Sequence, residues 1–97
     1  MSKPVLSGDA LHNAMSATGG WSLTDDGKAI EKSFKFANFK QAFAFMTHGA
    51  LSAETLDHHP EWFNVYHRVD VKLTTHDSGG ITELDISLAK ALNEAAS

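Results

Sequence analysis

The stretch "AIEKSFKFANFKQAFAFM" (residues 29–46) changes its hydrophobic period near its centre. In its first half, apolar and polar residues alternate, which predicts a half-buried strand with one wet face. From Asn38 onward, apolar residues recur at helical spacing as far as Leu56, and Asn38 can cap this helix. Because Pro60 disfavours helical geometry in the residue before it, the helix should end just before His59.

On the N-terminal side, Ser7 can cap a first helix, and a Gly-Gly pair ends it. The segment Trp21–Thr24 is then a short strand candidate. The stretch "DDGK" (residues 25–28) is a turn of the Asp-Gly type that joins antiparallel strands. We therefore expect Trp21–Thr24 and Ala29–Phe36 to form a β-hairpin.

On the C-terminal side, residues 62–75 are rich in β-branched and aromatic side chains. This run is too long for one strand, so we expect a second hairpin with its turn near His67–Arg68. Thr82 and Asp85 form a Thr-x-x-Asp capping box that begins a last helix. The order α-β-β-α-β-β-α predicts one α+β domain over residues 1–97, with a four-stranded antiparallel sheet and three helices on one face.

The composition is that of a small globular protein. Its 97 residues carry a formal net charge of −4, and the eight Lys and Arg form no basic run, so direct nucleic-acid binding is not expected. The absence of cysteine excludes disulfides and Cys-based zinc sites. No stretch approaches the roughly 18 apolar residues of a membrane helix, and the N-terminus lacks an apolar core of signal-peptide length. We expect a soluble, cytoplasmic protein.

Three of the six histidines stand in a context that suggests chemistry. In "LDHHPEWF" (residues 56–63), His58 and His59 lie where a helix gives way to extended backbone. Glu54 lies one helical turn before His58, close enough to orient its imidazole. His76 ends the last expected strand, where functional groups are common. These three imidazoles can converge, whereas nothing suggests a role for the remaining histidines: His12, His48 and His67.

Two chemistries compete for such a cluster, beside the alternative that it has none. Three imidazoles with Glu54 or Asp57 provide ligands that zinc or iron accept. The spacing matches no local metal motif, however, and adjacent histidines rarely bind one ion. Imidazoles also act as metal-free general acid and base, for which their ordinary pKa of about 6.5 is suited. The residues by themselves favour acid–base chemistry over metal binding without deciding between them.

One longer pattern is specific. It runs as Glu54, three residues, His58-His59-Pro60, five residues, Tyr66, nine residues, His76, eight residues and Asp85. This spacing resembles the signature of the pterin-4a-carbinolamine dehydratases at every fixed position and gap. The segments "GW" (20–21), "FKFANFKQAFAFM" (34–46) and "LTTH" (73–76) are also similar to that family. The resemblance covers about residues 5 to 95.

The resemblance implies a four-stranded antiparallel sheet with three helices on one face, and a homodimer or homotetramer. It implies a hydro-lyase, a 4a-hydroxytetrahydrobiopterin dehydratase, that converts 4a-hydroxytetrahydropterin to quinonoid dihydropterin and water. Family members use no metal and no organic cofactor. Aromatic amino acid hydroxylases release this pterin, so the resemblance also implies a functional link to such a hydroxylase in recycling of its cofactor. It implies no membrane partner.

The family's catalytic histidines fall on His58, His59 and His76 of this chain. We expect His58 and His76 to act as acid and base, and His59 to place the substrate. Asp85 belongs to the signature, although its capping-box position would also account for it. The resemblance assigns substrate contacts, or a supporting place beside them, to Glu54, Asp57, Pro60, Trp62, Trp21, Thr74, Thr75 and Asp77.

A second hypothesis is a protein-interaction module. Animal members of the family bind the dimerisation segment of a homeodomain transcription factor through a helical surface. An exposed apolar stripe on the helix Asn38–Leu56 would favour this role, but the same stripe would also build the homotetramer. A third hypothesis, from the histidine count alone, is a small metal-binding domain.

Overall fold

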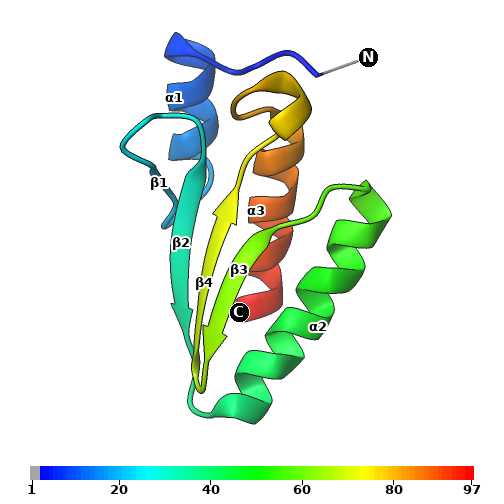
Figure 1. The fold of residues 1–97 in the computed structure, drawn as a ribbon. Helices are drawn as coiled ribbons and strands as arrows, with labels where there is room; N and C mark the ends of the chain where they lie inside the picture. Colours follow the sequence, from blue (N-terminus) through cyan, green and yellow to red (C-terminus); the bar gives the residue numbers. More distant parts are fainter. Residues whose placement is uncertain (1–2) are drawn as a thin grey trace.

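The computed structural model describes residues 3–97, with three α-helices and one four-stranded sheet in that range (Figure 1). The elements are α1 (Gly8–Ser16), β1 (Ser22–Leu23), β2 (Ile30–Lys35), α2 (Phe39–Leu56), β3 (Glu61–Val65), β4 (Arg68–Leu73), the short 3-10 helix η1 (His76–Ser78) and α3 (Glu83–Ala96). Their order confirms the α+β fold expected from the sequence. None of the helices within residues 3–97 is long and apolar enough to cross a membrane.

The strands lie in the order β1-β2-β4-β3, and all neighbours are antiparallel. In β4 every second residue is buried: Val69, Val71 and Leu73. Because successive side chains of a strand point to opposite faces, the sheet has one face that the helices cover and one that is open. Glu61, which begins β3, pairs with Lys72 near the end of β4. The loop after α2 and the turn after β4 therefore lie at the same end of the sheet (Figure 1).

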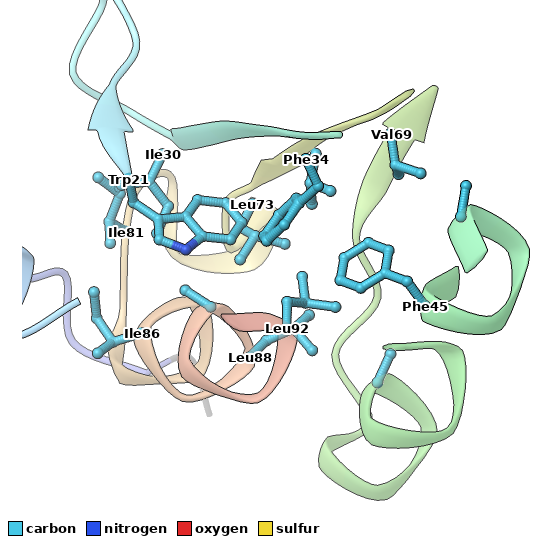
Figure 2. Packing of buried hydrophobic residues seen from close by; sticks show 14 residues of the cluster. Trp21, Ile30, Phe34, Phe45, Val69, Leu73, Ile81, Ile86, Leu88 and Leu92 are labelled. Carbon is cyan, nitrogen blue, oxygen red and sulfur yellow. The ribbon is translucent and has the colours of Figure 1, made fainter. Parts of the chain in front are cut away.

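The core lies between the covered face of the sheet and the helices α2 and α3 (Figure 2). Phe34 of β2 and Phe45 of α2 pack with their ring centroids 4.6 Å apart. Leu88 and Leu92 of α3 are fully buried. Each such side chain contributes about 1.5–3 kcal/mol of hydrophobic free energy. The amphipathic pattern of the helices, more than their helix propensity, therefore holds them on the sheet.

Gly49 lies in the middle of α2 and is buried. A Cβ at this position would lie 2.6 Å from Cδ2 of Leu92 and 3.1 Å from Cζ3 of Trp62. A glycine inside a helix costs about 1 kcal/mol relative to alanine. Here the missing side chain lets α2 approach both α3 and the start of β3, so the position of Trp62 depends on it.

Lys32 is a charged residue on the covered face of β2, where it is half-buried. Its Nζ donates to the carbonyl oxygen of Gly19 at 3.1 Å and to Oδ1 of Asn93 at 2.8 Å, and lies 4.7 Å from the centroid of the Phe34 ring. Burial lowers the pKa of Lys32 from its ordinary value of 10.5. The indole of Trp21 donates to the same oxygen of Asn93 at 3.0 Å. This cluster ties the segment before β1 to α3.

The helix caps follow the sequence in two of three cases. Oδ1 of Asn38 accepts a hydrogen bond from the backbone N–H of Gln41 at 2.9 Å, and the capping box of Thr82 and Asp85 is complete. Ser7 occupies the N-cap position of α1, but its side chain makes no capping hydrogen bond. The expectation that Ser7 caps α1 with its side chain is therefore wrong.

The first hairpin is shorter than expected, because β1 is limited to Ser22–Leu23. Trp21 is withdrawn into the core and is only 6% exposed. Thr24 belongs to the turn, where its Oγ1 accepts from the backbone N–H of Ala29 at 3.2 Å and donates to Oδ1 of Asp26 at 2.8 Å. Both ends of the expected strand are therefore used for packing and for the turn.

The turn of the second hairpin lies one residue earlier than expected. Val65 pairs with Arg68, so the turn consists of Tyr66 and His67. Tyr66 has a φ of 49°, as a two-residue hairpin turn of this kind requires. The side-chain amide of Asn64 donates to the carbonyl oxygen of Arg68 at 2.9 Å, which closes the turn without a glycine.

Candidate active site

The helix α2 ends in a left-handed residue that separates the two adjacent histidines. Asp57 is its C-cap, with φ 51° and ψ 43°, and the backbone N–H of His58 donates to the carbonyl oxygen of Ala53 at 3.0 Å. Pro60 then favours extended backbone. His58 is 9% exposed, whereas the side chain of His59 is 57% exposed. The two imidazoles thus leave the helix toward different environments.

His58 forms a buried pair with Asp85 of α3. Its Nε2 lies 2.5 Å from Oδ1 of Asp85, and the carboxylate is fully buried. Oδ2 of Asp85 accepts from the backbone N–H of Thr82 at 2.9 Å and from the hydroxyl of Thr75 at 2.8 Å. The carboxylate of Asp85 therefore caps α3 and holds His58 at the same time.

Glu54 contacts His59 and not His58. Its Oε1 lies 2.5 Å from Nε2 of His59, and both side chains are more than half exposed. The expectation that Glu54 orients His58 assumed that the helix continues to that residue. The left-handed backbone at Asp57 instead turns His58 toward α3 and brings His59 to Glu54, so the expectation is wrong.

His76 begins η1, which is separated from the end of β4 by two residues, and pairs with Glu61 at the start of β3. Its Nε2 lies 3.2 Å from Oε2 of Glu61, and the side chains are 81% and 52% exposed. Glu61 was not among the site residues expected from the sequence. The strand register could have found it, because Glu61 lies opposite Lys72, and Lys72 precedes His76 by one short extended segment.

The two threonines of the "TTHD" segment bond to other parts of the protein through their hydroxyl groups. The hydroxyl of Thr74 donates to the carbonyl oxygen of Lys28 at 2.6 Å. Thr75 is buried in the network around Asp85. Asp77 is exposed in η1. Both threonine hydroxyls are therefore already bonded within the protein.

The other expected site residues occupy the margin of this region or the core. Asp57 is exposed and Pro60 is half-buried between His59 and β3. Trp62 is half-buried and packs against the core cluster. Trp21 is a core residue bonded to Asn93. Trp62 therefore packs against the core and also has a partly exposed surface. Trp21 instead packs in the core and bonds to Asn93, which gives it a structural role.

The remaining histidines lie on other elements. His12 is exposed on α1, His48 is exposed on α2, and His67 lies in the turn after β3 against the ring of Tyr66. No three His, Cys, Asp or Glu side chains within residues 3–97 are grouped so that they could hold a metal ion. The structure thus separates the six histidines into three with a carboxylate partner at one end of the sheet and three elsewhere.

An open hollow of about 730 Å³ lies over the uncovered face of the sheet. Its lining includes Glu61 and Trp62 but none of the three paired histidines. Glu61 therefore stands between this hollow and His76. Most of the lining belongs to the three longer strands, with Glu31, Lys32 and Ser33 from β2, Phe63 from β3, and Asp70, Val71 and Lys72 from β4.

The sequence model of the family described as pterin 4 alpha carbinolamine dehydratase matches residues 4–95. This chain belongs to that family. The match covers nearly all of the chain, and it confirms the resemblance carried by the signature from Glu54 to Asp85.

Curated relatives of the dehydratase family are similar over most of their length. A protein of Rhizobium johnstonii is 61% identical over 90% of this chain and 86% of its own, and one of Mesorhizobium japonicum is 57% identical over 96% and 95%. Both carry the provisional name pterin-4-alpha-carbinolamine dehydratase.

Two solved structures share the fold. A transcriptional coactivator/pterin dehydratase from Brucella melitensis superposes with a TM-score of 0.93 at 50% identity, over 96% of this chain and 99% of that one. A pterin dehydratase-like protein identified as a RuBisCO assembly factor has a TM-score of 0.69 at 22% identity, over 80% and 90%. The second likeness concerns the fold alone.

Proposed function

We propose that this member of the dehydratase family converts 4a-hydroxytetrahydropterin to quinonoid dihydropterin and water by metal-free acid–base catalysis. The observation that carries the proposal is that His58, His59 and His76 each have a carboxylate partner at one end of the sheet. A paired carboxylate orients an imidazole and stabilises its protonated form. The proposed setting is the recycling of the pterin cofactor of an aromatic amino acid hydroxylase.

The reaction requires two proton transfers on a flat substrate. One imidazolium gives a proton to the 4a-hydroxyl, the C4a–O bond breaks and water leaves. A neutral imidazole takes the proton from the ring nitrogen, whose electron pair forms the new double bond to C4a. Each positioned group contributes roughly 10²–10⁴-fold to the rate. We assign these two transfers to His58 and His76.

The contacts of His58 support Nδ1 as the nitrogen that exchanges its proton with the substrate. Because an ionised carboxylate only accepts hydrogen bonds, Nε2 of His58 donates to Asp85. The neutral ring then has Nδ1 as its acceptor. His76 is the more exposed of the two and has its Nε2 at Glu61. His59, with Glu54, is assigned to binding the substrate from the solvent side.

Stopped-flow absorbance tests the assignment. The substrate is generated in place by a phenylalanine hydroxylase, and wild type is compared with His58→Ala and His76→Ala. Each variant should lower turnover by about 10²-fold or more while the circular dichroism spectrum stays folded. His12→Ala and His48→Ala are the controls and should be nearly silent. A His12 variant as impaired as the His58 variant would contradict the assignment of proton transfer to His58. A folded but inactive wild type would overturn the proposed function.

A second candidate function is supported by the surface of α2. Phe39, Phe43 and Leu51 are 47%, 55% and 65% exposed, and they lie along one side of that helix. A related solved protein bears the name transcriptional coactivator/pterin dehydratase. The same surface also suits a homodimer or homotetramer. Light scattering distinguishes self-association from binding of another protein. A homo-oligomer that Phe43→Glu dissociates would assign the surface to self-association. A monomeric wild type would support binding of another protein at this surface.

A further inference from the structure

A chain of buried hydroxyl groups lies behind His58. Thr75 follows β4 and Thr82 caps α3, and both are buried, at 8% and 0% exposed. The hydroxyl of Thr75 lies 2.8 Å from Oδ2 of Asp85 and 2.8 Å from the hydroxyl of Thr82. The residues Thr82, Thr75, Asp85 and His58 thus form one continuous hydrogen-bonded network that connects the end of β4, the start of α3 and the exit of α2.

The hydrogen-bond roles in this network have one consistent direction. Since a carboxylate only accepts, the hydroxyl of Thr75 donates its single proton to Asp85. Thr82 must therefore be the donor in its contact with Thr75. The oxygen of Thr82 in turn accepts from the backbone N–H of Leu84 at 3.2 Å. The acceptor-only carboxylate of Asp85 thereby fixes the direction of every hydrogen bond from the hydroxyl of Thr82 to the Nε2 proton of His58.

We propose that Thr75 is a positioning residue of the active site, whose hydroxyl holds the Asp85 carboxylate and thereby fixes the tautomer and orientation of His58. Its effect on the reaction rate rests on the proposed dehydratase function. Its effect on the ring of His58 does not depend on that function. The acceptor nitrogen of His58 is then set by a residue whose hydroxyl bonds to the carboxylate of Asp85 and not to the imidazole.

Helix capping explains the contact of Thr82 with Asp85 but not that of Thr75. Thr75 lies outside α3, where it forms an isolated β-bridge with Gly80. It also directly precedes His76 in the chain. The backbone that carries His76 is therefore tied to the carboxylate that holds His58. A shift at Thr75 would disturb both histidines that are assigned to proton transfer.

The test compares Thr75→Val, which removes the hydroxyl at similar volume, with Thr75→Ser, which keeps it. Thr18→Val is the matched control. Thr18 is 1% exposed, and its hydroxyl donates to the carbonyl oxygen of Ala14 at 2.7 Å, so this variant loses a buried hydroxyl bonded to α1. If Thr75→Val does not fold, Thr75→Cys is measured in its place, since a thiol is a weak donor.

The first readout is the ¹⁵N spectrum of the histidine rings. Wild type, Thr75→Ser and Thr18→Val should show His58 as a single tautomer with the proton on Nε2. Thr75→Val should show a mixture of tautomers and a Nε2 proton that exchanges with water about 10-fold faster or more, since one hydrogen bond of the carboxylate is lost. An unchanged His58 ring in folded Thr75→Val would overturn the proposal.

The second readout is the dehydration rate, if wild type has the proposed activity. Thr75→Val should lower kcat by about 10- to 100-fold with little change in KM, because a misplaced general acid or base lowers the rate of the chemical step. Thr75→Ser should restore most of it. If wild type is active and Thr75→Val keeps the full kcat, the proposed effect of Thr75 on the reaction rate is contradicted. An inactive wild type would end the proposed function, while the ring spectrum still decides the role of Thr75.

Discussion

His58 and His59 are neighbours in the chain, and each has a ring nitrogen 2.5 Å from a carboxylate oxygen, but the two pairs lie in opposite environments. The pair of His58 and Asp85 is buried beneath α3. The pair of His59 and Glu54 lies at the surface. Equal distances therefore do not mean equal contributions to stability, because water screens the outer pair and not the inner one.

The two pairs also differ in what else holds the carboxylate. Asp85 receives two further hydrogen bonds, from the backbone of Thr82 and the hydroxyl of Thr75. Glu54 contacts His59 from a flexible side chain that is 75% exposed. A buried, fully bonded carboxylate fixes its imidazole, whereas an exposed one lets its imidazole follow a ligand.

The largest effect should come from breaking the buried pair. Asp85→Ala leaves His58 without its partner and removes the Asp85 half of the capping box of α3, so the free energy of unfolding should fall by about 3–5 kcal/mol. Glu54→Ala breaks the exposed pair and should cost less than about 1 kcal/mol. Urea denaturation of both variants measures the difference. Equal losses would show that burial does not separate the two pairs.

A second test extends the comparison to an uncharged group at a buried position. Gly49→Ala should lower the free energy of unfolding by about 1–3 kcal/mol, because the new Cβ meets Leu92 and Trp62. Helix propensity alone would instead raise it by about 1 kcal/mol. Ala50→Gly, at the exposed next position of α2, measures that propensity separately. Stabilisation by Gly49→Ala would mean that the packing around Trp62 is loose.

A third test uses a half-buried cation. Because burial lowers the pKa of Lys32 in the folded protein, the unfolded chain binds more protons between that lowered value and 10.5. The contribution of Lys32 to the free energy of unfolding therefore rises with pH across this window. Wild type should gain stability relative to Lys32→Met as the pH is raised from neutral toward 10.5. Lys35→Met, on the open face of β2, is the control, and an equal trend in both variants would contradict the role of burial.

The smallest effect should come from an exposed carboxylate. Hydrogen bonds from the backbone N–H of Lys28 and the hydroxyl of Thr24 lower the pKa of Asp26 below its ordinary 3.8. Its contribution to stability is therefore present above pH 3.8 and is lost as the pH falls through the lowered pKa. Thermal unfolding of Asp26→Asn should differ slightly from wild type at neutral pH and not in strong acid. A difference that persists in acid would point to the turn geometry instead of the charge.

The sequence predicts most of the fold because its signals are local. The change of period after Phe36, the cap at Asn38 and the capping box of Thr82 all act within one helical turn. The structure has α2 and α3 at the positions these signals indicate. The predicted position of the two-residue turn at Tyr66 was wrong by one residue. Its left-handed residue is not a glycine, and the contact that closes it comes from the side chain of Asn64.

The partners within the candidate site could not be read in the same way. Their contacts join residues far apart in the chain: His58 with Asp85, and His76 with Glu61. Such contacts depend on the strand register and on the direction of the chain after α2. The signature named Glu54, the histidines and Asp85, and the resemblance named Thr75, but the pairing of Glu54 with His59, the contact of Thr75 with Asp85 and the involvement of Glu61 required the fold.

The left-handed backbone at Asp57 limits which mutations can accumulate there without loss of fitness. Glycine, asparagine and aspartate adopt this conformation most readily, and a β-branched residue would be strained. Neutral substitutions at position 57 are thus confined to these few residue types, even where selection does not require the carboxylate. An insertion or deletion beside it would change the directions in which His58 and His59 leave the helix. Laboratory evolution of new substrates should therefore leave this position and its spacing intact while it varies Glu54.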